Sequence, residues 1–205
     1  MGMTMVEKIL ARSAGQPAVR PGDIVTVEVA TAVVIDQNFM HNRMREPNSV
    51  WDPDKIVIML DHIAPADSPM RAAMHKAARQ FADKHGIERF HDVGSELGIC
   101  HQLVADHGYA LPGTVLACVD SHTCSAGAFN CAARGLGHPE MSYICATGKT
   151  WFPVGETVRY ELTGALAPFL NAKDIILHIA NEWGNHATLN VEFAGDGARA
   201  MSMDA

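Results

Sequence analysis

Positive charge, long apolar runs and paired cysteines are all scarce in this sequence, and each shortage excludes a class of protein. Lys and Arg number 16 against 23 Asp and Glu, so the formal charge is −7, the wrong sign for a chain-wide nucleic-acid surface. No apolar run approaches the roughly 18 residues that a membrane-spanning helix needs. The five cysteines form no C-x-x-C pair, so neither a disulfide framework nor a metal site made of cysteines alone is expected. Nucleic acid and membrane are therefore not expected partners.

The residues that are abundant suit a buried core. The chain has 205 residues, of which 48% are hydrophobic, enough for one globular domain or two small ones. Its first residues, Met1 to Glu7, lack the basic-then-apolar order of a secretory signal. The cysteines lie in segments that resemble core elements. We therefore expect a cytoplasmic protein with reduced thiols.

Caps and turns mark two helices. Thr4 and Glu7 have the spacing of a capping box, and Gly15 ends the helix that they begin. Ser68 and Gly86 are the expected N-cap and stop of a helix over 69–85. The expected buried stripe of this second helix consists of Met70, Met74, Ala77 and Phe81.

Short apolar runs separated by helix-length segments predict buried parallel strands. The expected strands are 25–35, 56–60, 89–93, 114–119, 157–162 and 189–193, and the further expected helices are 125–133, 139–146 and 172–183. Segment 36–54 is expected as a loop with one helical turn, 148–150 as a loop, and 135–137 as a turn after a helix. This alternation predicts an α/β fold, with a layered, largely parallel sheet and flanking helices over residues 1–205.

Polar side chains gather where three of the expected strands end. Strand 56–60 is followed by Asp61 and His62, strand 114–119 by Asp120, Ser121 and His122, and strand 89–93, after a glycine-bearing loop, by His101. Ligands of parallel sheets bind outside the carboxyl ends of the strands, so we expect the three histidines to share one pocket. Each of them, taken alone, is equally well explained as a surface residue. Together they predict an acid–base site, because imidazole exchanges a proton near neutral pH and a carboxylate orients it.

Two other side chains near this position are weaker candidates. Ser121 has a histidine neighbour, but consecutive side chains of an extended segment point apart, so a serine-hydrolase pair is not expected. For Cys124 a buried structural thiol is favoured over a nucleophile.

Five motifs together carry a family resemblance. They are Leu60-Asp61-His62, Gly98-Ile99-Cys100-His101-Gln102, Val119-Asp120-Ser121-His122-Thr123, Ala146-Thr147-Gly148-Lys149-Thr150 and Val191-Glu192-Phe193-Ala194-Gly195. In order and spacing they resemble the aconitase superfamily, in particular the N-terminal part of large subunits of the 3-isopropylmalate dehydratase and homoaconitase type. The likeness extends over nearly the whole chain.

The resemblance implies a hydro-lyase that removes water from a hydroxy di- or tricarboxylic acid and adds it back one carbon away. Substrates of the family include 3-isopropylmalate, homocitrate or homoaconitate, and citrate, and a 4Fe-4S cluster acts as Lewis acid. By resemblance, Asp61 and His62 serve the leaving hydroxyl, and His101 and Asp120 support the acid and the water. Ser121 is expected to bind a substrate carboxylate and His122 to position water.

The same resemblance implies that much of the family's machinery is not in these 205 residues. The cysteines that bind the cluster, a further glutamate, the serine base and the substrate-binding arginines belong to later segments or to a small subunit. We therefore expect that this chain alone binds no cluster and turns over no substrate, and that it acts with a cluster-bearing and a small-subunit partner or self-associates. Ile35 also departs from the family, where a polar Gln or His is usual.

Two alternatives stay open. One is a non-catalytic, truncated or degenerate module of the same fold. The other is a cluster-independent dehydratase that uses a divalent metal, held by His62, His101, His122 and the neighbouring aspartates, since imidazole and carboxylate suit such a metal.

Overall fold

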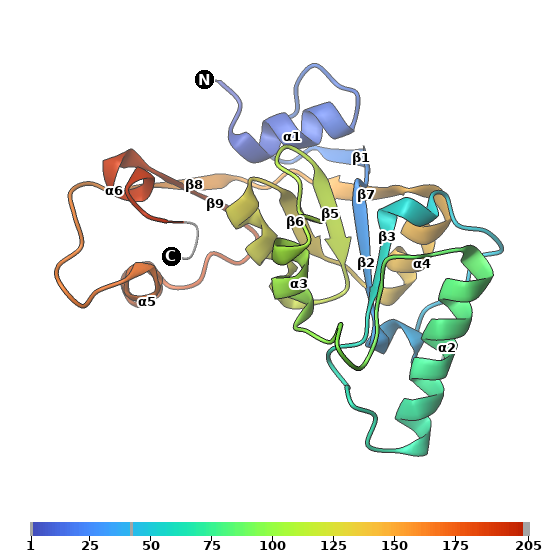
Figure 1. The fold of residues 1–205 in the computed structure, drawn as a ribbon. Coiled ribbons are helices and arrows are strands. Elements are labelled where there is room, and N and C mark those ends of the chain that lie inside the picture. The colour runs from blue at the N-terminus through green and yellow to red at the C-terminus, as the bar shows by residue number, and fades with distance from the viewer. Residues whose placement is uncertain (1, 42, 203–205) are drawn as a thin grey trace.

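The computed structural model describes residues 2–41 and 43–202, and its centre is a five-stranded sheet in which all neighbouring strands are parallel (Figure 1). The strand order is β4-β3-β2-β5-β6. The strands are β2 (Thr31–Ile35), β3 (Ile56–Met59), β4 (Phe90–His91), β5 (Val115–Cys118) and β6 (Ala132–Gly135). Every residue of β2, β3 and β5 is buried, as expected of parallel strands covered on both faces. The expected α/β class is confirmed.

Two apolar cores cover the two faces of this sheet. On one face, Val34 and Ile58 pack with helices α1 (Met5–Ser13), α2 (Pro69–His85) and α4 (His138–Thr147). On the other, Val33 and Ile35 pack with the short helix α3 (Cys100–Asp106) and the 3-10 helix η3 (Ser121–Phe129). Successive residues of a strand point to opposite faces, so β2 contributes to both cores.

Helix α2 has the expected ends but a rotated buried face. Ser68 accepts a hydrogen bond from the Arg71 N–H, and Gly86 ends the helix with φ 66. Met70, expected in the stripe, is 67% exposed because it lies in the first turn, beyond the sheet. The buried positions include His75 and Ala78 in addition to Met74 and Phe81.

The expected strand 25–35 is two strands in two different sheets. β1 (Ile24–Glu28) pairs antiparallel with β7 (Lys149–Pro153), whereas β2 joins the central sheet. The chain changes partner between them: the Val29 N–H donates to the Gly148 carbonyl and the Ala30 N–H to the Val115 carbonyl. The apolar residues continue through both strands, so the sequence pattern does not reveal that the chain changes its pairing partner. The loop expected at 148–150 is wrong for the same reason, since Lys149 and Thr150 begin β7.

Segment 125–133 is also not the helix that its small residues suggested. It is the end of η3, which stops at Asn130 in the left-handed region (φ 56), followed by β6. Gly135 then lies against the backbone of Asp120, where an added Cβ would be 2.5 Å from the carbonyl oxygen. This close approach places β6 beside the loop that follows β5.

The last part of the chain forms a separate β-α-β arrangement. It comprises β8 (Thr157–Glu161), α5 (Ala172–Trp183), β9 (Asn190–Ala194) and a short α6 (Gly195–Arg199), and β8 and β9 pair in parallel. Figure 1 shows α5 and α6 standing off from the central sheet. Eight large apolar side chains of this part are exposed, namely Leu166, Phe169, Leu170, Ile176, Leu177, Trp183, Val191 and Phe193. We call these eight the C-terminal apolar set.

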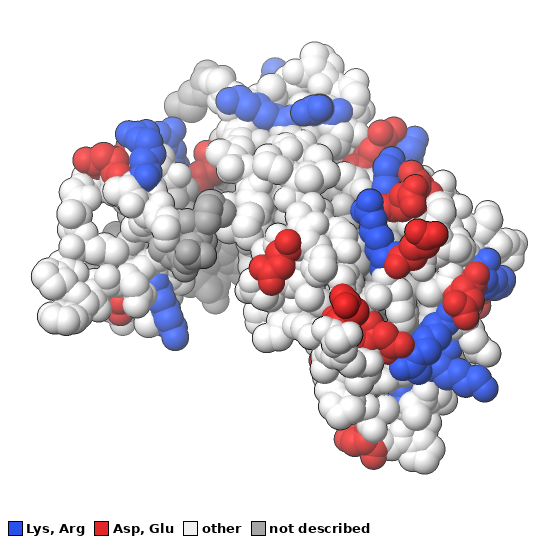
Figure 2. Space-filling model, in the orientation of Figure 1, with Lys and Arg blue, Asp and Glu red and all other residues white. Residues whose placement is uncertain are grey.

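The face shown in Figure 2 carries charge of both signs. Lys and Arg are mixed with Asp and Glu around α2, and a short row of basic side chains lies over α1. Within the described residues, no helix combines the length and apolarity that crossing a bilayer requires.

Candidate active site

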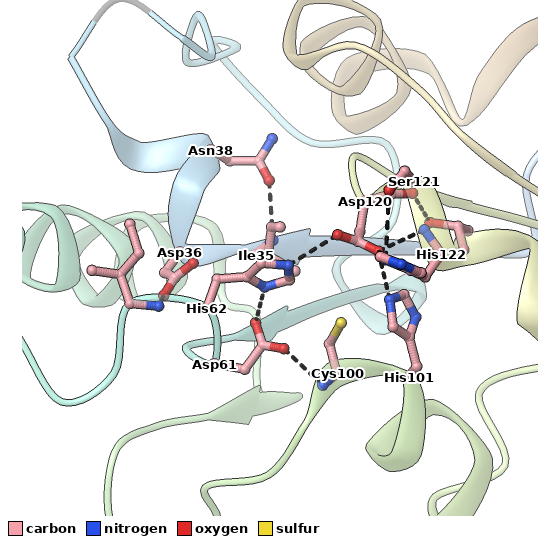
Figure 3. A network of polar contacts seen from close by, with 12 residues as sticks. Ile35, Asp36, Asn38, Asp61, His62, Cys100, His101, Asp120, Ser121 and His122 are labelled. Carbon is pink, nitrogen blue, oxygen red and sulfur yellow. Dashed lines mark hydrogen bonds and ion pairs between the residues drawn. The ribbon is translucent and has the colours of Figure 1, made fainter.

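The three strand ends singled out in the sequence converge on one network of side chains (Figure 3). We call Asp61, His62, His101, Asp120 and His122 the strand-end network. Asp61 and His62 lie in the loop after β3, Asp120 after β5, and His101 in the first turn of α3. Nε2 of His62 is 3.0 Å from Oδ2 of Asp120, and Nε2 of His101 is 2.7 Å from Oδ1 of the same carboxylate. The three histidines thus converge on one carboxylate, as expected.

Asp120 is the centre of this network. In addition to the two imidazoles, its Oδ1 accepts the backbone N–H of His122 at 2.7 Å, which makes Asp120 the N-cap of η3. Burial by itself would raise the pKa of Asp120, but the hydrogen bonds from His122, His62 and His101 outweigh it and hold the pKa well below its usual range. Asp120 is therefore a permanent anion at neutral pH.

His62 lies between two carboxylates. Nδ1 donates to Oδ1 of Asp61 at 2.7 Å while Nε2 donates to Asp120. Burial lowers the pKa of His62, but the hydrogen bonds to Asp61 and Asp120 outweigh this effect and raise the pKa to about 8. His62 is therefore protonated at neutral pH and is suited to give a proton to a bound substrate.

The Asp61 carboxylate is itself held by hydrogen bonds to two partners. Its Oδ1 binds His62, and its Oδ2 accepts the backbone N–H of Cys100 at 2.8 Å. Cys100 is the first residue of α3, so the start of this helix orients the carboxylate that orients His62.

The side of the network formed by Ser121 and His122 is open to solvent. The His122 side chain is 81% exposed, and its Nδ1 lies 3.1 Å from Asp120 and 3.5 Å from Oγ of Ser121. A recess beside His101, lined by Cys118 and Thr123 among others, has a volume of only about 20 Å³. That recess is too small for a tricarboxylic acid, so an open face of the network is where a substrate would approach.

The cysteines do not provide a site for an iron–sulfur cluster. All five are free, and four of them are buried in the core. Such clusters need several thiolates around one centre, whereas each metal-competent group among the described residues contains at most one cysteine. Hydrogen bonding to Cys118 and burial raise the pKa of Cys100, which disfavours its thiolate. Cys124 is exposed, so the expectation of a buried thiol there is wrong: η3 turns that side chain outward.

Two groups have a geometry that a divalent metal could use. Ligand atoms of Asp61, His62 and Cys100 lie within 4.8 Å of one another, as do those of His101, Asp120 and His122. The second group offers nitrogen and oxygen only, which suits a divalent transition metal better.

Asp36 was missed as a site residue, although a signal for it exists. It directly follows β2, whereas one residue separates Asp61 and Asp120 from the ends of β3 and β5, and its Oδ2 accepts the N–H of Ile63 at 2.7 Å. The strand-end rule finds it once β2 is recognised as a strand of the parallel sheet. Its neighbour Ile35 is 1% exposed and belongs to the apolar core, so no polar group lies at that position.

Fold and site together define an α/β protein with a hydrogen-bonded network of imidazoles and carboxylates at the carboxyl edge of a parallel sheet. The profile of the Aconitase family (aconitate hydratase) matches residues 7–205. The chain belongs to the Aconitase family, as its motifs suggested.

Three relatives show the extent of the likeness. The chain is 48% identical to the "3-isopropylmalate dehydratase large subunit" of Mycolicibacterium smegmatis, covering 100% of this chain and 48% of the relative. It is 43% identical to the "3-isopropylmalate dehydratase large subunit 1" of Methanopyrus kandleri (99% and 49%). It is 40% identical to the "Methanogen homoaconitase large subunit" of Methanocaldococcus jannaschii (98% and 48%). The chain thus spans about half the length of these relatives.

Proposed function

We propose that residues 1–205 are the N-terminal α/β part of a cytoplasmic hydro-lyase. The substrate is a hydroxy di- or tricarboxylic acid such as 3-isopropylmalate, homocitrate or citrate, or the unsaturated acid formed by its dehydration, such as homoaconitate. The observation that carries the proposal is the doubly held His62, an imidazolium between Asp61 and Asp120 at the open edge of the sheet. Family membership and the names of the relatives support this reaction class.

In this proposal His62 protonates the leaving hydroxyl. The C–O bond breaks, the hydroxyl takes the proton of His62 and departs as water, and loss of a C–H proton to a base completes the double bond. Asp61 and Asp120 hold the ring before and after the transfer, because each carboxylate stabilises the charged form. Re-addition of water on the neighbouring carbon reverses these steps.

The remaining members of the network have supporting roles. His101 holds Asp120 from the side opposite His62 and so keeps its second oxygen occupied. Ser121, exposed beside His122, binds a carboxylate of the substrate, and His122 positions the departing water. The described cysteines do not fit an iron–sulfur cluster, so in this proposal the cluster is held by another segment, which also supplies the base.

A cluster-bearing partner segment and a small subunit complete the enzyme in this proposal. The relatives are about twice as long as this chain, and their names are those of large subunits. The C-terminal apolar set supports a partner surface in this part of the chain, since clustered exposed apolar side chains mark interaction sites. A two-stranded sheet such as β8-β9 is also marginal without further packing.

The test is complementation. We expect the chain to gain dehydratase activity when it is combined with the second half of a relative's large subunit and its small subunit under anaerobic cluster reconstitution. The wild-type chain, His62→Gln and the matched control His41→Gln, an exposed histidine outside both the strand-end network and the C-terminal apolar set, are assayed with each candidate acid. Activity that needs His62 but not His41 supports the proposal, and no turnover of any acid with a loaded partner contradicts it.

A second candidate, a divalent-metal dehydratase, is favoured by the convergence of His101, Asp120 and His122. If this candidate is correct, the chain incubated with Zn²⁺, Mn²⁺ or Fe²⁺ contains one equivalent of metal by elemental analysis. The His122→Ala variant loses that metal. Metal-free protein excludes it. If neither activity is found, the non-catalytic module remains.

A further inference from the structure

A buried carboxylate with no role in the proposed reaction lies directly behind His62. Asp36 begins the 3-10 helix η1 (Asp36–Phe39) and is fully buried. Its Oδ2 accepts the backbone N–H of Ile63, the residue after His62, at 2.7 Å. Figure 3 shows Asp36 on the side of His62 that is remote from Asp120. It therefore contacts the loop of the network and not its open face.

The stability of the fold does not explain why a carboxylate is buried at this position. Its Oδ1 is buried without a hydrogen-bond partner among the described residues, as is Nε2 of His75 on α2. That nitrogen lies 3.9 Å from Oδ2, beyond hydrogen-bond distance. Burial raises the pKa of Asp36, and the backbone N–H groups of Ile63 and Gln37 offset this only in part. A buried, half-satisfied carboxylate weakens a fold compared with an apolar residue of similar size.

The contact acts on the one segment whose position matters for His62. The loop between β3 and α2 is tied at Asp61 by the Cys100 N–H and at Ile63 by Asp36. His62 is the residue between these two ties. With both in place, the Asp61 carboxylate is held on one side of His62 and the Ile63 backbone on the other, and the ring meets Asp61 and Asp120 at hydrogen-bond distance.

We propose that Asp36 is a positioning residue for His62, acting through its hydrogen bond to the peptide N–H of Ile63. The anchor itself follows from geometry, and only its effect on turnover rests on the proposed function. Loss of the anchor frees the C-terminal side of the loop, so the His62 ring spends less time between its two carboxylates.

Two substitutions separate the anchor from the charge. Asp36→Asn removes the charge but keeps an oxygen that accepts the Ile63 N–H, whereas Asp36→Leu removes the acceptor at similar volume. The readouts are amide hydrogen exchange at Ile63 and the pKa of His62, both followed by NMR on the full chain. In Asp36→Leu we expect Ile63 exchange to be at least about 10-fold faster, because an anchored amide opens less often. The pKa of His62 falls from about 8 toward its ordinary 6.5.

Asp36→Asn serves as the conservative rescue and His75→Phe as the neighbour control. Both are expected to leave Ile63 exchange within about twofold of wild type, because the hydrogen bond survives. Unchanged exchange and an unchanged His62 pKa in folded Asp36→Leu overturn the inference. If the leucine variant does not fold, Asp36→Ser, whose hydroxyl is too short to reach Ile63, gives the same comparison.

The activity of the complemented enzyme is a second, independent test of the positioning role. Asp36→Leu is expected to lower kcat by about 100-fold with KM within about twofold, since a small displacement of a catalytic group affects the transition state and not ground-state binding. Asp36→Asn retains most of kcat. If wild type shows no activity while the NMR results hold, the proposed function fails and the anchor stands. If activity is present and Asp36→Leu leaves kcat unchanged, the positioning role fails.

Discussion

Nε2 of His62 donates to Oδ2 of Asp120 at 3.0 Å, and this one bond joins the loop after β3 to the loop after β5. The two strands are not neighbours, because β2 lies between them. Asp120 is held by the start of η3 and His62 by Asp61, so the bond connects two independently fixed groups. It is the contact on which the electrostatics of the site depend.

The dependence of stability on pH follows from His62. Its pKa is raised to about 8 from the ordinary 6.5, so folding binds a proton more tightly. The stabilisation is complete below about pH 6.5 and is lost as the pH rises through about 8. We expect the thermal midpoint of wild type to fall more than that of His62→Gln between pH 6 and 9, measured by circular dichroism in low salt. Equal slopes for the two proteins contradict the shift. High salt is expected to reduce the difference, because His62 is partly exposed.

Removal of the Asp120 charge is expected to uncouple the network. In Asp120→Asn the two imidazoles lose their shared anion, so the pKa of His62 falls and η3 loses a charged N-cap. Unfolding stability is expected to drop by about 1 to 3 kcal/mol, as for loss of a hydrogen-bonded charge. Urea unfolding and NMR titration measure the two effects. Asp106→Asn, at an exposed aspartate of α3 that accepts a hydrogen bond from the Gln102 side chain, is the control and should change neither.

The sequence was most informative where local chemistry decides the structure. The capping box of Thr4 and the cap and stop of α2 are local signals, and the structure has both. The strand ends at Asp61 and Asp120 were found because buried strands carry apolar runs that stop abruptly. Polar residues at those points therefore stood out before any pairing was known.

Pairing between distant segments was the part that local patterns did not reveal. β6 is made of Ala132, Ala133, Arg134 and Gly135, which carry no strand signal, and it exists because β5 offers it an edge. The break between β1 and β2 depends on contacts with Gly148 and Val115, residues more than 80 positions away. For the same reason Asp36 was not recognised as a strand-end residue.

Thiol labelling is expected to distinguish the exposed cysteine of η3 from the four buried cysteines. Cys124 is exposed, while Cys100, Cys118, Cys131 and Cys145 are buried. With a thiol-specific chromogenic reagent we expect one fast-reacting group per native chain and five after unfolding in denaturant. Cys124→Ser removes the fast group and leaves stability within about 0.5 kcal/mol of wild type, as for a surface substitution. Fast labelling of two or more thiols in the native chain would contradict the buried positions.

The C-terminal apolar set is expected to control association of the isolated chain. Leu177 on α5 is 57% exposed and Trp183, also on α5, is 58% exposed. Covering such side chains removes apolar area from water, at roughly 25 cal/mol for each Å². We expect wild type to self-associate at high concentration and Leu177→Glu to shift the population toward monomer, as measured by multi-angle light scattering. Ile24→Glu, at an equally apolar and 71% exposed position of β1, is the matched control and should associate like wild type.

The same Leu177→Glu change should weaken complementation by the second half of a relative's large subunit while leaving the His62 titration intact. A wild-type chain that stays monomeric at all concentrations, with Leu177→Glu complementing as well as wild type, would show that this surface is not an interface.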